Sequence, residues 1–439
     1  MALSGIQIYK LLPQTNCKEC GFPTCLAFAM KLAAKQVELS ACPYVSEASK
    51  TQLAESAAPP IRLVALKSDG YEVKVGNEVV LFRHEKTFYN KPGIFVQVTD
   101  DLAAEEIKKL VAPAEAFSIN YVGINLTLDG FAVASITGNP AKFAESVKAV
   151  RQSSKRPIIL ISSDPAVATA GLDVLSGESP LVATAEATNW EAMASLAKGK
   201  GASLVVSAES LDGLADLTEK AKGKGVESLV LYPKASSLGA ELVLNTQIRR
   251  LAVKKNFRAL GFPTIAFPKD PAGAAQAITK YAGFIVLDHF SPELIYPLLV
   301  LRQNIYTDPQ KPIQVQPGLY EINSPKPTDP VLVTTNFSIT YFSVANEVEG
   351  SGLPAWLLVT DAEGMSVLTA WAAGKFDAER IAKAVKGFNV VEKITTKRLV
   401  IPGHVAVLSG ELEEELPGWE IRVGPREAVD IPAFMKMAL

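Results

Sequence analysis

The four cysteines are the residues whose type and spacing most directly indicate chemistry. They are Cys17, Cys20, Cys25 and Cys42, in the pattern C-x2-C-x4-C-x16-C, and no cysteine follows them. Iron–sulfur clusters are ligated by four thiolates, often with one farther along the chain. A structural zinc site normally shows two close pairs, and disulfides are rare in cytosolic proteins. The spacing therefore favours a [4Fe–4S] cluster over zinc or disulfides.

The residues around the cysteines predict a tight loop followed by a helix. Gly21 and Pro23 suit the loop, since glycine reaches backbone angles that other residues avoid and proline stiffens the turn. Thr24 is placed to cap a helix with Cys25 in its first turn, where the helix dipole favours a thiolate. Pro43, directly after the last cysteine, is a common companion of ferredoxin-type motifs.

Composition narrows the class of protein. The 439 residues are 48% hydrophobic and 21% charged, with a net charge of −2, which is typical of globular domains and predicts no nucleic-acid partner. No apolar run approaches the roughly 20 residues of a membrane span. Lys10 and Pro13 interrupt the stretch where a signal peptide needs apolar residues. We therefore expect a cytoplasmic protein that does not bind a membrane.

Proline-rich breaks divide the chain into three predicted domains. The small, polar segment 47–60 ends in two prolines, and the segment 322–330 contains three. We predict a cluster domain with its linker at 1–58, a central domain at 59–325 and a C-terminal α/β domain at 326–439. The two breaks are candidate hinges.

The central domain alternates short apolar strands with helices. Continuous apolar runs indicate a parallel sheet that is buried on both faces. Eight such runs predict a (βα)8 TIM barrel, with an open doubly wound sheet as the alternative. The predicted strands are 61–67, 94–100, 157–163, 180–184, 202–207, 227–232, 264–267 and 283–288.

The C-terminal domain also alternates strands and helices, but with fewer predicted strands than the central domain. Strands are predicted at 331–335, 355–361, 398–401 and 419–423, with helices at 375–387 and at the C-terminus. This order indicates a Rossmann-like α/β fold. The sequence has three histidines, and of these only His404 lies in this domain.

Several strings resemble one known family. The cysteine segment N-C-K-E-C-G-F-P-T-C-L-A-F-A-M-K-L-A closely resembles the large subunit of the corrinoid iron–sulfur protein of the acetyl-CoA (Wood–Ljungdahl) pathway. So do L-F-R-H-E-K-T-F-Y, T-Q-I-R-R-L-A-V-K-K, R-Q-N-I-Y-T-D-P-Q and, near the C-terminus, G-M-S-V-L-T-A-W-A-A-G-K-F. The resemblance covers essentially the whole chain, and the three predicted domains match the order in the family.

The resemblance implies a methyl carrier. It implies a [4Fe–4S] domain, a TIM barrel and a C-terminal domain that binds cobalamin without its lower base or a protein histidine on cobalt. Reduced cobalt would accept a methyl group from methyltetrahydrofolate through a methyltransferase and pass it to the nickel centre of acetyl-CoA synthase. The cluster, fed by a low-potential electron donor, would reactivate oxidised cobalt. A small subunit would complete a heterodimer.

The resemblance also places the corrinoid in the C-terminal domain, where loops after parallel strands commonly hold ligands. By the family's pattern, Thr369 would lie under the cobalt without being a ligand. The expected cofactor-binding residues come from three segments, and each could instead be an ordinary turn residue. They are Thr335, Asn336, Thr340, Tyr341, Met365, Ser366, Val367, Leu368, Thr369, Gly374, Glu427, Ala428 and Val429.

The barrel leaves other functions open. Asp288 and His289 end a predicted strand, where barrel enzymes keep their chemistry, although a docking scaffold is favoured. The basic run 246–255 is expected to be partly a solvated face or part of a subunit interface. Two competing hypotheses are an iron–sulfur electron-transfer subunit without a corrinoid and a pterin-binding methyltransferase that uses the barrel.

Overall fold

The computed structural model describes residues 4–33, 36–50, 53, 58–85, 88–121, 124–307 and 313–438. Its residues form two compact units, Met1–Phe117 with Thr127–Tyr306, and Ser118–Leu126 with Thr307–Leu439. Each unit is described by itself. Six positions of the predicted linker at 47–60 lie outside the described residues, namely 51, 52 and 54–57.

The cysteine domain is a small helical body. Its elements are α1 (Gly5–Tyr9), α2 (Cys25–Ala33) and the 3-10 helix η1 (Leu39–Ala41). Ser4 and Gln7 form a capping box that starts α1. The small core contains Ile8, Leu12 and Phe28 together with two of the cysteines.

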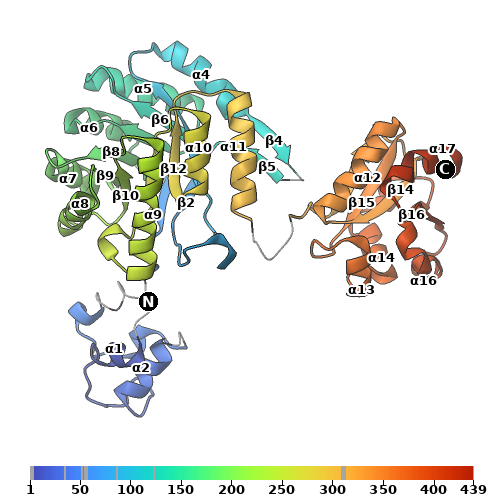
Figure 1. Ribbon diagram of the computed structural model, residues 1–439, viewed down its shortest axis with the longest axis horizontal. Coiled ribbons are helices and arrows are strands. Elements are labelled where there is room, and N and C mark those ends of the chain that lie inside the picture. Colours follow the sequence, from blue (N-terminus) through green and yellow to red (C-terminus); the bar gives the residue numbers. More distant parts are fainter. Residues whose placement is uncertain are drawn as a thin grey trace. The chain divides into compact units, whose positions relative to one another are not determined.

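The central domain is a closed barrel of eight parallel strands inside a ring of helices (Figure 1). This confirms the predicted barrel and excludes the open sheet. The strands, in the order of pairing around the barrel, are β3 (Gly93–Thr99), β6 (Gly130–Ala134), β7 (Ile158–Ile161), β8 (Leu181–Ala185), β9 (Ser203–Ala208), β10 (Leu229–Pro233), β11 (Thr264–Ala266) and β12 (Ala282–Leu287). The helices are α4 (Ala104–Ala116), α5 (Pro140–Ser153), α6 (Pro165–Val174), α7 (Trp190–Lys200), α8 (Leu211–Gly223), α9 (Leu238–Lys255), α10 (Pro271–Thr279) and α11 (Pro292–Ile305).

One predicted barrel strand was wrong. The residues from 61 to 67 were expected in the barrel, but β1 (Val64–Ser68) pairs antiparallel with β2 (Tyr71–Val75). Gly70, with φ +77°, permits the tight turn between them. The hairpin packs Val64 and Val75 against the barrel interior, and β6 takes the vacant place in the barrel.

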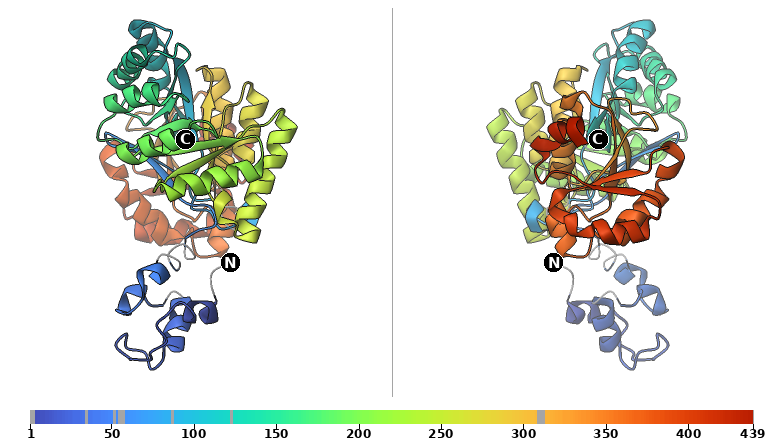
Figure 2. Two further views of the ribbon diagram at one scale, coloured as in Figure 1. Left: turned by 90° about the vertical axis from the view of Figure 1, so that its left-hand side faces the viewer. Right: turned by 90° about the vertical axis from the view of Figure 1, so that its right-hand side faces the viewer.

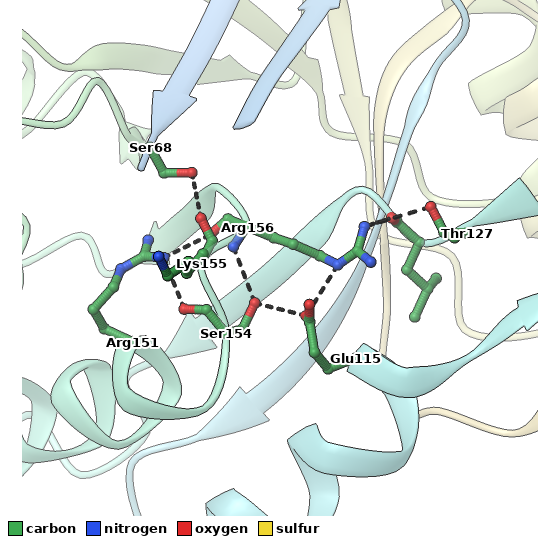
Figure 3. Close-up of polar contacts among 8 residues, drawn as sticks. Ser68, Glu115, Thr127, Arg151, Ser154, Lys155 and Arg156 are labelled. Carbon is green, nitrogen blue, oxygen red and sulfur yellow. Dashed lines mark hydrogen bonds and ion pairs between the residues drawn. The ribbon is translucent and has the colours of Figure 1, made fainter. Parts of the chain in front are cut away.

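A polar network fastens the β1–β2 hairpin to the barrel (Figure 3). Ser68 Oγ donates to the carbonyl of Lys155 at 2.6 Å. The neighbouring Arg156 donates to Glu115 at 2.9 Å and to the Leu128 carbonyl at 2.6 Å. Because most of these groups are partly buried, the network fixes the loop before β7 as well as the hairpin.

The basic run 246–255 is only partly a solvated face. Arg249 is 1% exposed and forms an ion pair with Glu78. Its guanidinium also stacks on the ring of Tyr281, 4.4 Å from the ring centre. Arg250 and Lys254 are exposed as expected. Arg249 therefore stabilises the barrel, since removing one partner of a buried pair is costly.

The C-terminal unit is a five-stranded sheet with helices on both faces (Figure 2). The strands, in spatial order, are β13 (Gly318–Ile322), β15 (Ala355–Thr360), β14 (Val331–Thr335), β16 (Arg398–Ile401) and β17 (Glu420–Val423). The helices are α12 (Ser338–Ser351), α13 (Val367–Ala372), α14 (Ala378–Gly387), α15 (Val390–Lys393), η4 (Gly403–Leu408), α16 (Ser409–Glu415), η5 (Ala428–Asp430) and α17 (Ile431–Ala438). A short two-stranded sheet, β4 (Ser118–Tyr121) with β5 (Ile124–Thr127), precedes β6 in the chain.

The first strand of this sheet lies before the domain boundary drawn at residues 325 and 326. β13 pairs antiparallel with β15, from Gly318 opposite Val359 to Ile322 opposite Ala355. The prolines after β13 therefore fall inside the C-terminal unit, in the connection between two strands of one sheet. The four parallel strands follow the flavodoxin-like order, in which the first strand, β14, lies between the second and the third.

Candidate functional site

The cysteine site is built by one helix start and two loops. Cys25 is the first residue of α2, and Thr24 Oγ accepts the N–H of Ala27 at 3.1 Å as the predicted cap. Cys42 directly follows η1. Cys25 and Cys42 are buried, Cys20 is half-buried and Cys17 is exposed, and all four are free thiols.

Asn16 organises the loop around Cys25. Its side-chain oxygen accepts the Cys25 N–H at 2.8 Å, and its own N–H donates to the Cys25 sulfur at 3.4 Å. Asn16, Lys18 and Gly21 all have positive φ, so the loop curls around the cysteines. An N–H donor aimed at sulfur and a helix N-terminus are features that suit a thiolate bound to a cluster.

The four cysteines supply the ligand type that an iron–sulfur cluster requires. All four are unpaired, and they lie on one small body. Among the described residues, no group of three or more Cys, His, Asp or Glu side chains is arranged to hold a single metal ion.

A hydrogen bond connects the two cysteine segments. Tyr44 Oη donates to Glu19 Oε1 at 2.8 Å, and Glu19 lies between Cys17 and Cys20 in the chain. The pKa of Tyr44 is raised, first by this hydrogen bond and then by the charge of Glu19. Burial and the thiols of Cys17 and Cys42 add to the rise, so the hydroxyl lies within electrostatic reach of both segments.

The second candidate site is a cavity of ≈ 400 Å³ in the C-terminal unit. It lies at the carboxyl ends of β14 and β16, where chain connections leave the sheet in opposite directions. Such switch points are the usual ligand crevices of open α/β sheets. The lining is mostly apolar with a polar rim, and it includes Leu332, Val333, Thr334, Phe337, Ile339, Thr340, Ser343, Val344, Ser366, Val367, Leu368, Val400, Ile401, Pro402, His404, Gly424, Pro425, Arg426, Glu427, Ala428, Ile431 and Phe434.

The structure brings six of the expected cofactor-binding residues together at this cavity. Thr340 comes from α12, and the others come from the start of α13 and from the segment after β17. The six are Thr340, Ser366, Val367, Leu368, Glu427 and Ala428. Three sequence segments that are far apart in the chain therefore line one crevice.

The remaining expected residues do not line it. Thr335 and Asn336 are buried at the end of β14, and Tyr341 packs against Tyr320. Met365 packs against the core on the α13 side of the sheet. The exposed residues Thr369, Gly374 and Val429 are also outside the lining.

Sequence reasoning missed the wall formed by the β16 loop and α17. Pro402 and His404 follow β16, whereas Ile431 and Phe434 belong to α17. The signal for the β16 loop is the order of the strands: a crevice beside β14 also needs the loop of its other neighbour, β16. The α17 residues show only the apolar pattern of a packed helix.

The barrel mouth holds an acid–histidine pair but a less developed site. His289 Nδ1 and Asp288 Oδ1 are 2.6 Å apart, and both side chains are exposed. A cavity of ≈ 110 Å³ beside them is also lined by Asp270, whose carboxylate caps α10. This leaves Asp288 and His289 solvated rather than held in a dry catalytic geometry.

No helix in the described part of the chain is long and apolar enough to cross a membrane. The cysteine domain, the barrel and the switch-point crevice define a modular protein of the iron–sulfur class whose α/β unit contains a crevice. Residues 12–44 match a family described as a putative Fe–S cluster. Residues 63–435 match the CO dehydrogenase/acetyl-CoA synthase delta subunit family.

Full-length relatives identify the family more closely. The chain is 44% identical to the corrinoid/iron–sulfur protein large subunit of Moorella thermoacetica, over 100% of both chains. It is 36% identical to the acetyl-CoA decarbonylase/synthase complex subunit gamma of Methanopyrus kandleri, over 99% of this chain and 97% of that one. The chain belongs to this family of corrinoid/iron–sulfur large subunits and synthase gamma subunits.

A solved structure also resembles part of the chain. Dihydropteroate synthase from Thermus thermophilus is 16% identical, with a TM-score of 0.38, and the match covers 51% of this chain and 99% of that one. A similarity at this level carries no argument about function.

Proposed function

We propose that the chain is a methyl carrier that holds a corrinoid at the crevice between β14 and β16. When bound, a corrinoid would supply a cobalt centre able to carry a methyl group from methyltetrahydrofolate, through a separate methyltransferase, to the nickel centre of acetyl-CoA synthase. The observation that carries the proposal is the ≈ 400 Å³ crevice at the switch point, together with the relatedness to corrinoid/iron–sulfur large subunits.

The lining suits one part of the corrinoid in particular. Val344, Val400 and Phe434 give the crevice an apolar interior, whereas Arg426 and Glu427 lie among the polar lining residues. A lower base that has left the cobalt is a flat heteroaromatic group with a phosphate-bearing tail. Its ring would gain from burial in such a recess, and its tail would meet polar groups. The lining therefore supports a base-off corrinoid.

We assign His404 to the lining of the crevice and assign it no bond to cobalt. Its Nε2 lies 3.7 Å from Glu427 Oε1, so the imidazole has a carboxylate neighbour within the lining. A cobalt without a nitrogen ligand is easier to reduce, because axial ligands stabilise the higher oxidation states. The same logic assigns the cysteine domain to reductive reactivation, with electrons entering from a low-potential donor near exposed Cys17.

Exposed apolar side chains support a partner that covers the corrinoid. Ile339 and Leu368, both in the lining, are 66% and 46% exposed, and Trp371 on α13 is 42% exposed. Apolar groups gathered at one site mark a surface for association. We assign it to the small subunit of a heterodimer that works in the cytoplasm. An electron-transfer subunit without a corrinoid would leave this crevice unused, and a barrel methyltransferase would need a better organised mouth.

Filling the crevice tests the proposal. Val344→Trp places a large side chain into the lining, and Asn346→Trp places the same side chain on the exposed face of α12. Both variants are prepared with the small subunit and cobalamin, and bound cobalt is measured. We expect Val344→Trp to lose at least tenfold in retained corrinoid and Asn346→Trp to retain it. Equal retention by both variants would contradict the assignment of the crevice.

A further inference from the structure

The hydrogen bond between Tyr44 and Glu19 is the most informative contact that the proposed function does not use. It joins the loop that carries Cys17 and Cys20 to the segment that follows Cys42. Tyr44 is 53% exposed, and Glu19 is exposed as well. The contact therefore lies on the solvent side of the cysteine site, next to its most exposed ligand, Cys17.

We propose that Glu19 and Tyr44 form a latch across the exposed side of the cluster, and that the Glu19 carboxylate keeps the cluster potential low. This inference rests on the proposed function only for the presence of the cluster.

The latch follows from the chain connections. Three cysteines lie on residues 17–25, and the fourth lies on a separate segment beyond α2. Cys25 is fixed by Asn16, and Cys42 is buried in the small core. The Tyr44–Glu19 bond joins the two segments by side chains outside that core. Opening it would let the fourth ligand separate from the loop, so the bond limits cluster loss.

The effect on potential follows from charge. Reduction adds one electron to the cluster, and a nearby negative charge opposes that addition. The carboxylate of Glu19 accepts a hydrogen bond from the hydroxyl of Tyr44, and no cation among the described residues forms an ion pair with it. Its negative charge therefore stays beside the cysteines in a fixed position. Because Glu19 is exposed, solvent and salt screen this effect, so it is expected to be larger at low ionic strength.

Two variants separate the two roles. Glu19→Gln removes the charge, but its amide oxygen can still accept the hydrogen bond from Tyr44. Tyr44→Phe removes the hydrogen bond and keeps the charge. Glu105→Gln, an exposed charge removal in helix α4 of the barrel, is the matched control. All are made in the full chain, assembled with its partner and corrinoid.

Cluster content is measured first, by iron analysis and electron paramagnetic resonance, followed by a redox titration and by the rate of iron release to a chelator. We expect Glu19→Gln to raise the ratio of reduced to oxidised cluster at a fixed potential by roughly two- to tenfold. We expect Tyr44→Phe to speed iron release several-fold. A Glu19→Gln titration that matches Glu105→Gln overturns the charge role, and wild-type release from Tyr44→Phe overturns the latch. A wild-type chain without any cluster would contradict the proposed cofactor itself.

Discussion

The side-chain oxygen of Asn336, at the end of β14, accepts the backbone N–H of Gly364 at 3.0 Å. It also accepts the N–H of Ala362 at 2.9 Å. Gly364 has φ +72°, so the loop after β15 turns sharply at this point. Asn336 at the end of β14 therefore holds the loop that follows β15 and leads to Ser366 and α13. One wall of the crevice depends on a single buried amide.

Asn336→Ala is expected to weaken both the unit and its grip on the corrinoid. The variant leaves two buried N–H groups without an acceptor. Each is expected to lower the free energy of unfolding by about 1–3 kcal/mol. Retained corrinoid is expected to fall by at least tenfold, because the loop before Ser366 loses its anchor. Cobalt content and urea unfolding of the assembled protein measure the two effects. Asn346→Ala on the exposed face of α12 is the control, and equal behaviour of the two variants would refute the anchoring role.

His404→Ala is expected to leave the cobalt environment unchanged. The imidazole faces Glu427 and is assigned no bond to cobalt, so its removal deletes only a lining contact. The measurement is the electron paramagnetic resonance spectrum of Co(II) in the assembled protein. The account predicts no nitrogen splitting in the wild type and the same spectrum in the variant. Nitrogen splitting that disappears in His404→Ala would show instead that the histidine is a ligand.

Cys20→Ala is expected to separate the two cofactor roles. Loss of one thiolate destroys the cluster or converts it to a form with fewer irons, so reactivation of oxidised corrinoid fails. Delivery of a methyl group from protein that is already methylated should survive. Both steps are followed in single-turnover assays, with exposed Ser40→Ala as a control in the same domain. Failure of the delivery step in Cys20→Ala would give the cluster a direct role in transfer.

The stability of the barrel is expected to depend on pH through the carboxyl group of Asp100. Burial alone would raise the pKa of this carboxyl, but hydrogen bonds from Thr137, Ser135 and Ile136 outweigh it and hold the pKa below its usual value. A lowered folded pKa contributes stability that is present above the unfolded value of about 3.9 and is lost as pH falls through the folded value. Asp100→Asn should therefore cost about 1–3 kcal/mol at pH 7 and less in acid.

Urea unfolding at neutral and acidic pH measures this difference. Asp101→Asn, which changes the exposed neighbour, is the matched control. A cost for Asp100→Asn that stays constant from neutral pH into acid would show that the ionised carboxylate is not what the hydrogen bonds stabilise.

The barrel could be predicted from sequence because its strands are continuous apolar runs, but one strand could not be assigned. β1 and β6 are both short strands with apolar residues, so the sequence does not distinguish them. Only the pairing of β1 with β2 shows that β1 belongs to a hairpin and β6 to the barrel. Gly130 shows the same limit. A Cβ there would collide with the ring of Phe95, a requirement that depends on neighbours across the sheet. The burial of Arg249 within the basic run could likewise not be predicted, because its partner Glu78 is distant in sequence.

The two candidate sites also differ in how far they could be predicted from the sequence. The proposed cysteine ligands follow from residue type and spacing, which are local properties. The crevice depends on strand order, since β16 borders it only because β14 lies between β15 and β16. Residues such as Ser366 and Glu427 could be proposed from their loops. The β16 loop and α17 could be added only when the order of strands was known.

The most direct test of the account is transfer of labelled methyl groups to the intact heterodimer. The protein, loaded with corrinoid and reduced, is mixed with labelled methyltetrahydrofolate and its methyltransferase, and protein-bound label is compared with bound cobalt. The account predicts label in proportion to cobalt, its release on addition of acetyl-CoA synthase, and loss of both label and cobalt in Val344→Trp. Label that fails to appear on cobalt-loaded protein, or that appears without cobalt, would contradict the assignment of this chain as a corrinoid methyl carrier.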